Sequence, residues 1–200
     1  MPGGASQARP ASFTGAVELC DRFSMPVRKR TDADLDACVQ LARLVHESDG
    51  YPMYLPDDLR TFITAPDALC TLVAEEDGEV VGHVALNPRS SPAVMEMATG
   101  ALGLPADRLA VVARLLVSPR HRRRGLGRSL LEAAAQQARG RGLWPILDAV
   151  TLHQAAICLY DRCGWIRAGT VSVRWGEHPQ VEELVYLGPR PSEDKGDPRL

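Results

Sequence analysis

The sequence lacks several features that would assign it to a specialised class of protein. No apolar run approaches the ~20 residues that span a membrane, and residues 1–12 lack the charged-then-apolar pattern of a secretory signal. The five cysteines are odd in number and none stands at C-x-x-C spacing, which disfavours a disulfide framework or a zinc site. Lysine is confined to two positions, and the net charge of −2 disfavours a general nucleic-acid binder. We therefore expect a cytoplasmic protein with no metal, membrane or nucleic-acid partner.

The chain is long enough for one domain with a substantial core. Residues 1–24 are rich in Gly, Ala, Ser and Pro and predict a mobile tail, residues 25–187 form the domain, and residues 188–200 predict a frayed C-terminal tail. Strands are expected at 26–30, 69–75, 79–87, 109–117, 143–150, 171–175 and 181–187, with Asp77-Gly78 as a hairpin turn. Helices are expected at 32–49, 58–63, 92–99, 127–139 and 153–163, with Gly100 breaking the third.

The most informative stretch joins an apolar strand to a helix through a turn rich in arginine and glycine. Pro119 ends the strand, and Gly125 and Gly127 precede the helix. The first turn of a helix leaves backbone N–H groups without partners and carries partial positive charge. The glycines let a phosphate approach this backbone closely, and four nearby arginines add charge-assisted donors. The stretch therefore fits a pyrophosphate group.

Two common phosphate motifs do not match this turn. The nucleotide P-loop requires a lysine that is missing, and Leu130 stands where the dinucleotide fingerprint has its third glycine. What remains is Arg122-x-x-Gly125-x-Gly127 after a strand that ends Val-x-Pro. This pattern resembles the acyl-coenzyme A signature of the GNAT N-acetyltransferase family. The alternative for residues 120–124 is a basic patch or a nuclear-localisation-like run.

A second segment strengthens the resemblance. After the fifth strand the family typically reads Asn-x-x-Ala-x-x-Leu-Tyr, three residues, then Gly-Phe. The matching residues here are Ala156, Leu159, Tyr160 and Gly164, while Trp165 replaces Phe and His153 stands at the Asn position. The two matches occur in the family's order, and the resemblance extends from Met25 to Leu187.

The resemblance implies an α/β (α+β) fold in a single domain. Its central sheet would be mixed and mostly antiparallel, with six to seven strands and helices on both faces. The fourth and fifth strands would be parallel and splay apart, leaving backbone groups free to bind the pantetheine arm, with an N–H near Leu116 on the thioester carbonyl. By resemblance, the residues that bind the coenzyme are Leu115, Leu116, Val117, Arg122, Arg123, Arg124, Gly125, Leu126, Gly127, Arg128, Ser129, His153 and Ala156.

The implied reaction moves an acetyl group from acetyl-CoA to a primary amine by direct attack in a ternary complex. Tyr160 would protonate the departing thiolate as general acid. A carboxylate is expected to take the proton of the ammonium, and Glu47, Glu96 and Asp148 are candidates among which the sequence does not choose. We interpret His83, a lone histidine inside a strand, as structural.

The acceptor is a small-molecule or peptide amine that the sequence does not identify. The aromatic loop at 51–55 and the insertion at 91–104 are expected to shape its pocket. Two other readings are a non-catalytic acyl-CoA-binding or regulatory module, and a nucleic-acid binder that uses the patch from Arg120 to Arg128. An edge strand of the C-terminal hairpin could pair two copies into a homodimer or remain free.

Overall fold

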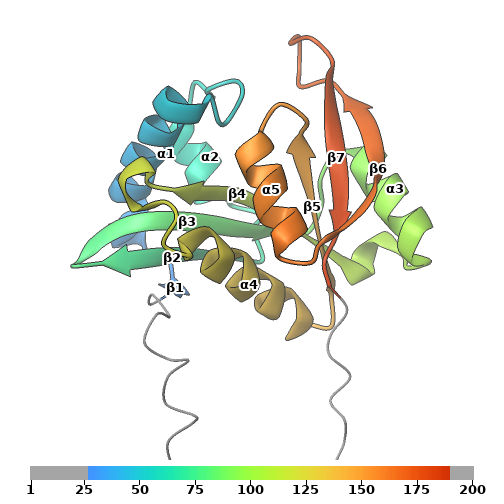
Figure 1. The fold of residues 1–200 in the computed structure, drawn as a ribbon, viewed down its shortest axis with the longest axis horizontal. Coiled ribbons are helices and arrows are strands. Elements are labelled where there is room, and N and C mark those ends of the chain that lie inside the picture. Colours follow the sequence, from blue (N-terminus) through green and yellow to red (C-terminus); the bar gives the residue numbers. More distant parts are fainter. Residues whose placement is uncertain (1–26, 190–200) are drawn as a thin grey trace, which may run out of the picture.

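The computed structural model describes residues 27–189, so the expected N-terminal tail at 1–24 lies outside the described residues. Within this range seven strands form one sheet in the order β1-β2-β3-β4-β5-β7-β6 (Figure 1). The strands are β1 (Val27–Lys29), β2 (Cys70–Glu76), β3 (Glu79–Asn87), β4 (Leu109–Val117), β5 (Trp144–Val150), β6 (Ile166–Val173) and β7 (Val181–Leu187). The β4–β5 pair is parallel and the other pairs are antiparallel, which confirms the expected mixed sheet.

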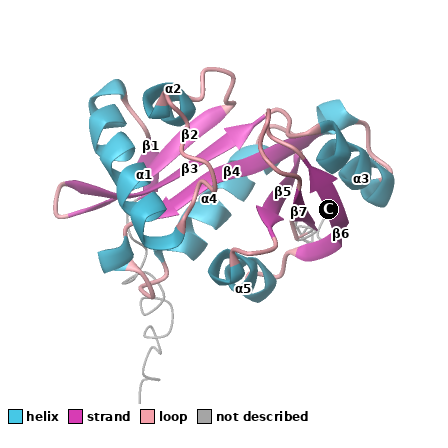
Figure 2. Cartoon of the chain, turned by 90° about the horizontal axis from the view of Figure 1, so that it is seen from above, coloured by secondary structure: helices cyan, strands magenta, loops and turns pink. Residues whose placement is uncertain are grey.

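Five helices cover the two faces of this sheet. They are α1 (Leu35–Asp49), α2 (Leu59–Thr64), α3 (Pro92–Leu102), α4 (Leu126–Arg139) and α5 (Gln154–Arg162). One core layer joins α4 and α5 to the sheet, and two further clusters join α1 with α2, and α3, to its opposite face. Figure 2 shows α5 on one side of the strands and α2 and α3 on the other. No helix between residues 27 and 189 has the length and apolar character that a membrane span requires.

Local sequence explains where most elements begin and end. Gly50, with φ 69°, ends α1 in the left-handed conformation that glycine adopts without strain. The Asp58 carboxylate accepts the Thr61 N–H at 2.9 Å and begins α2. Asp77 and Gly78 have φ values of 52° and 81°, as the tight hairpin between β2 and β3 requires.

Two expectations were wrong in detail. Gly100 does not break α3, which continues to Leu102 because Val94 and Ala98 anchor it against β6 and β7. The strand expected at 171–175 begins at Ile166, because its first residues pair with the end of β7. Of the C-terminal tail expected at 188–200, residues 190–200 lie outside the described residues, and the Gly188 N–H donates to the Pro145 carbonyl at 2.8 Å.

Candidate active site

The sheet opens between its two parallel strands. β4 and β5 pair only where Leu109–Val111 faces Trp144–Ile146. Beyond this point β4 continues to Val117 and β5 continues to Val150 without pairing with each other. Figure 1 shows β5 turning away from β4, with α5 lying across the opening. The predicted splay is therefore present, and it leaves edge backbone groups of β4 free to bind a ligand.

A bulge in β4 lies at this opening. Ala113 pairs with Ala85 and Leu116 pairs with His83. Arg114 and Leu115 therefore stand opposite one residue of β3, as in a β-bulge. Arg114 adopts φ 52° although it is not a glycine, which is a strained conformation of the kind that concentrates at functional sites.

The direction of the backbone N–H groups can be followed from the end of β4. The Ser118 N–H donates to the Val81 carbonyl of β3 at 2.9 Å. Because successive residues of a strand point to opposite edges, Leu116 shares the direction of Ser118, whereas Val117 and Leu115 point toward the opening. The Leu116 side chain is fully buried beneath α1 and α2. The edge that could bind a coenzyme arm is thus carried by Leu115 and Val117. The Val117 carbonyl on this edge accepts long hydrogen bonds from the Arg122 guanidinium at 3.4 Å.

The predicted pyrophosphate turn leads directly into α4. Gly125 precedes the helix with φ 86°, and a Cβ there would meet no atom within 4 Å, so the turn is open. Arg123 also has a positive φ, of 63°. Leu126 is 1% exposed, so only its backbone could reach a ligand. Arg128 is exposed, and the Ser129 N–H bonds to Gly125 in the first turn of the helix.

Two arginines of this turn already have acidic partners. Arg122 donates to both carboxylate oxygens of Asp49 at 2.7 and 2.5 Å, and Arg124 pairs with Glu76 at 3.2 Å. The basic patch expected from the sequence is thereby partly neutralised. Arg122 also links the turn to the end of α1, a connection that the sequence did not reveal.

Helix α5 lies beside this turn. A Cβ on Gly127 would come within 3.1 Å of the Leu159 side chain, so glycine permits the close approach of α4 and α5. His153 precedes α5 and Ala156 lies in its first turn. The His153 ring packs edge-to-face against Tyr51, with 5.6 Å between centroids. The coenzyme-binding residues predicted from the two motifs therefore lie on three neighbouring elements, β4, α4 and α5.

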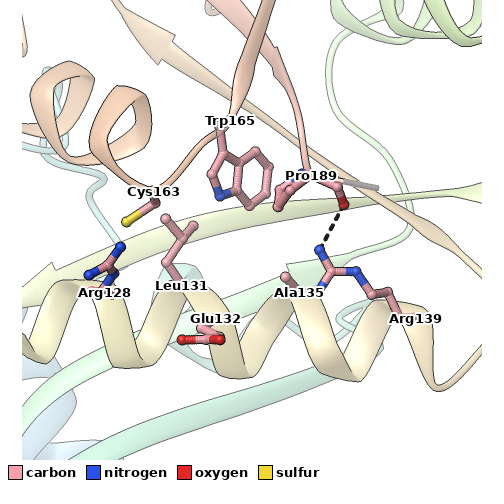
Figure 3. A pocket seen from close by; sticks show the side chains of 8 residues that line it. All are labelled: Arg128, Leu131, Glu132, Ala135, Arg139, Cys163, Trp165 and Pro189. Carbon is pink, nitrogen blue, oxygen red and sulfur yellow. Dashed lines mark hydrogen bonds between the residues drawn. The ribbon is translucent and has the colours of Figure 1, made fainter. Parts of the chain in front are cut away.

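A small hollow continues from this site along α4. Its volume is about 120 Å³, and Figure 3 shows Arg128 and Glu132 of α4 at one wall. Cys163 and Trp165 come from the end of α5 and the residues that follow it. Arg139 donates to the Pro189 carbonyl at 2.8 Å and closes the far end.

Tyr160 is 8% exposed and lies on α5 beside the opening. Burial raises the pKa of its hydroxyl far above the ordinary value, and the neighbouring Tyr51 and Asp148 raise it further. The phenol therefore keeps its proton throughout the physiological range. The Tyr186 hydroxyl donates to Asp161 at 3.0 Å, whereas no acceptor among residues 27–189 holds the Tyr160 hydroxyl.

Two carboxylates lie near the same opening on the face opposite α4. Asp148 of β5 accepts a hydrogen bond from the Ser90 hydroxyl at 2.9 Å, and burial raises its pKa. Glu183 of β7 is 2% exposed. Burial and the charge of Asp148 raise the pKa of Glu183 to about 8. Sequence reasoning named Asp148 but missed Glu183, although its period-two spacing from the apolar Val181 and Val185 places it on the inward face of the strand.

The hydroxyl of Tyr51 lies near Asp148 and Arg114. Burial and the carboxylate of Asp148 raise the pKa of this hydroxyl to about 12, while the charge and the backbone N–H of Arg114 act in the opposite direction. Its loop is held by Tyr54, whose ring stacks on His178 at 3.7 Å and meets Trp175 edge-on. The aromatic loop after α1 therefore contacts the β6–β7 turn, which the sequence did not predict.

Other candidates lie elsewhere. Glu47 and Glu96 are exposed on α1 and α3. His83 is fully buried and its Nδ1–H donates to the Arg114 carbonyl at 3.1 Å, as a structural histidine would. The insertion at 91–104 is mainly a core helix, and the residue that reaches the opening is Ser90, just before it. Among the described residues no cluster of His, Cys, Asp and Glu could hold a metal ion.

Comparison with known protein families agrees with this geometry. The model of the Acetyltransferase (GNAT) family matches residues 35–165, which run from the start of α1 to the third residue after α5. The chain belongs to the GNAT acetyltransferase family. The match includes the splayed strands, the turn before α4, and Tyr160.

Mammalian N-acetyltransferases are similar to part of the chain. N-acetyltransferase family 8 member 3 from Mus musculus is 30% identical over 116 residues, which are 58% of this chain and 46% of that protein. N-acetyltransferase 8 from Homo sapiens is 33% identical over 101 residues, 50% of this chain and 40% of that protein. The chain thus spans less than half the length of these relatives.

Solved GNAT structures share the fold. Ribosomal-protein-alanine N-acetyltransferase from Brucella melitensis has a TM-score of 0.61 at 23% identity, covering 81% of this chain and 98% of that one. The yncA protein from Salmonella typhimurium, solved with its cofactor acetyl-CoA, has a TM-score of 0.60 at 19% identity. The match covers 88% of this chain and 99% of that one. At these identities the likeness concerns the fold alone.

Proposed function

We propose that the protein transfers the acetyl group of acetyl-CoA to the primary amine of a small molecule or peptide. The observation that carries this proposal is the splay of β4 from β5, bordered by the glycine turn of α4 and by Tyr160. The open backbone edge at Leu115 and Val117 suits the amide groups of pantetheine. The unobstructed turn at Gly125 and the N-terminus of the fourteen-residue α4 suit a pyrophosphate.

The group that accepts a proton and the group that donates one lie on opposite faces of the sheet. A backbone N–H at Leu115 or Val117 would stabilise charge that develops on the thioester oxygen. Glu183, beside Asp148, would take a proton from the attacking ammonium, because a base works best with a pKa near the operating pH. Tyr160 would give its proton to the departing sulfur. Direct attack in a ternary complex fits this arrangement, since each face supplies one of the two proton transfers.

We place this reaction in a reducing compartment such as the cytoplasm. Cys38, Cys70, Cys158 and Cys163 are free thiols in the described part of the chain, as is usual for proteins of that compartment. If two copies associate, they could pair along β6, one of the two edge strands of the sheet within the described residues.

Thermal unfolding with acetyl-CoA, ATP and NAD tests the coenzyme site. Acetyl-CoA at ~100 times its Kd should add about 2.7 kcal/mol to the free energy of unfolding, whereas ATP and NAD at equal concentrations should not. Release of free thiol from acetyl-CoA should then depend on an added amine. A thermal shift without thiol release across an amine panel would favour the non-catalytic module, and no shift with acetyl-CoA would contradict the proposal.

A further inference from the structure

Arg114 carries a charge that the fold leaves without a counter-ion. The arginine lies in the β4 bulge, its Cζ stands 4.7 Å from the Phe62 ring centroid, and one terminal nitrogen donates to the Asn87 side chain at 3.3 Å. Its Nε is buried with no hydrogen-bond partner, and no acidic residue between 27 and 189 forms an ion pair with it. Partly buried charges in proteins are usually paired. This guanidinium is therefore available to bind the anionic group of a ligand.

A cavity of about 570 Å³ opens beside this guanidinium. Its lining includes Asn87, Arg89 and Arg114 together with the loop from Ala65 to Ala68. Asp67 is the one acidic residue of the lining, so the cavity has an excess of positive charge. A planar guanidinium beside an amide suits a carboxylate, which can accept two parallel hydrogen bonds from arginine.

The cationic cavity and the carboxylates of the active site are close neighbours. Asn87 bonds to Arg114, and Ser90, three residues later, bonds to Asp148. Because consecutive Cα atoms are 3.8 Å apart, the Cα atoms of Asn87 and Ser90 are separated by at most ~11 Å. The hydroxyl of Tyr51 lies close enough to Arg114 and to Asp148 for the charge of each to act on it. A single small molecule can therefore reach both charges.

We propose that the acceptor is a small molecule with an anionic group near its primary amine, and that Arg114 binds this anion while Asp148 and Glu183 face the ammonium. This inference rests on the proposed acetyl transfer and names its substrate class. An acceptor that carries only an amine would satisfy the carboxylates and leave Arg114 unpaired. An acceptor of amino-acid type would pair with both, and Arg89 at the exposed end of the cavity would admit an anion at a greater distance.

Matched acceptors of equal length test the inference. Glycine, β-alanine, 4-aminobutyrate and 6-aminohexanoate are compared with unsubstituted alkylamines, and L-phenylalanine with 2-phenylethylamine, at saturating acetyl-CoA. We expect the acid to exceed its matched amine at least tenfold in kcat/KM for at least one pair. Arg114→Gln should lower this ratio toward one, mainly by raising the KM of the acids. Arg114→Lys should retain part of the preference, and Arg43→Gln, an exposed arginine of α1, should retain all of it.

The outcomes separate this inference from the function on which it rests. Failure of acetyl-CoA to raise the unfolding temperature would contradict the acetyltransferase itself. Turnover of alkylamines and amino acids with equal kcat/KM would overturn the role of Arg114 alone. If none of these amines reacts, the unfolding temperature with acetyl-CoA and 4-aminobutyrate or L-phenylalanine decides: a further rise in the wild type but not in Arg114→Gln supports the anion site, and no rise overturns it.

Discussion

At the scale of single residues, Tyr160 is the group whose role can be tested most directly. Its buried hydroxyl keeps its proton, and no acceptor between residues 27 and 189 holds it. Tyr160→Phe preserves the ring and removes the proton. We expect kcat to fall about 100-fold, as for loss of a general acid, with the affinity for acetyl-CoA unchanged.

Tyr186→Phe is the matched control for this change. Tyr186 is also buried, and the two rings lie 5.5 Å apart, but the Tyr186 hydroxyl is held by Asp161. We expect this variant to lose stability and to keep its kcat. An equal loss of kcat in both variants would mean that the aromatic packing, and not the proton, supports turnover.

Glu183 leads to a prediction about pH. With a pKa of about 8, kcat/KM should rise with pH up to that value in the wild type. Glu183→Gln should lower the rate and remove this limb of the profile. Glu182→Gln, the exposed neighbour on the same strand, should leave the profile unchanged. A limb that persists in Glu183→Gln would assign the base to another group.

Stability supplies a second readout of the same carboxyl. The folded protein holds the Glu183 proton more tightly than the unfolded chain, whose pKa is near 4.5. The stabilising contribution is therefore complete below pH 4.5 and is lost as pH rises through 8. The unfolding temperature of the wild type should fall relative to that of Glu183→Gln between about pH 5 and pH 8, and the difference should level off above pH 8.

The sequence identifies residues of the site only where a local pattern marks them. Tyr160 was found because it stands in a motif of fixed spacing. Glu183 adjoins another glutamate, and the choice between them depends on which strand face the sheet buries. Arg114 interrupts an apolar run, and its significance depends on a bulge whose partner, Val84, is thirty residues away in the sequence. Contacts of this kind are set by tertiary structure and have no local signature.

At the scale of elements, two glycines that look alike in the sequence should respond oppositely to alanine. Gly125 has a φ of 86° in open space, so alanine there should cost about 1–2 kcal/mol through strain alone and weaken acetyl-CoA binding. Gly100 lies inside α3 with right-handed geometry and no atom near an added Cβ. Alanine at this position should therefore add about 1 kcal/mol to the free energy of unfolding. Denaturant unfolding of the two variants measures both changes in the free energy of unfolding. Stabilisation by Gly125→Ala would contradict the strain assigned to the turn.

Some boundaries of helices and strands are set by nearby residues, and others are set by tertiary contacts. The ends of α1 and α2 were predicted well because Gly50 and Asp58 act locally. The continuation of α3 through Gly100 and the early start of β6 at Ile166 were missed. Both depend on contacts between α3, β6 and β7, which a one-dimensional pattern does not contain.

At the scale of the whole molecule, the mixed sheet with its parallel, splayed β4–β5 pair was predicted by family resemblance and not by periodicity. Alternating apolar residues predict strands, but they do not indicate that β7 inserts between β5 and β6. They also do not indicate that β4 and β5 separate after three paired residues. This separation brings loops from distant parts of the chain, at Tyr51 and at Ser90, to one opening.

The Asp49–Arg122 ion pair couples the two halves of this opening. Asp49 ends α1 just before the Tyr51 loop, and Arg122 lies in the turn assigned to pyrophosphate. Burial alone would raise the pKa of Asp49, but the hydrogen bonds from Arg122 and Ser48 lower it, so the pair persists at neutral pH. A pyrophosphate that engages Arg122 must compete with this carboxylate.

Asp49→Asn should therefore strengthen acetyl-CoA binding and weaken acceptor binding. A partly exposed pair is worth about 0.2–1 kcal/mol, which corresponds to a gain of up to ~5-fold in coenzyme affinity by titration calorimetry. The acceptor KM should rise because the Tyr51 loop loses its link to Arg122. Asp36→Asn removes the Asp36–Arg60 pair at the other end of α1 and should change neither value. Unchanged or weaker coenzyme binding in Asp49→Asn would show that Asp49 orients Arg122 for the pyrophosphate instead of competing with it.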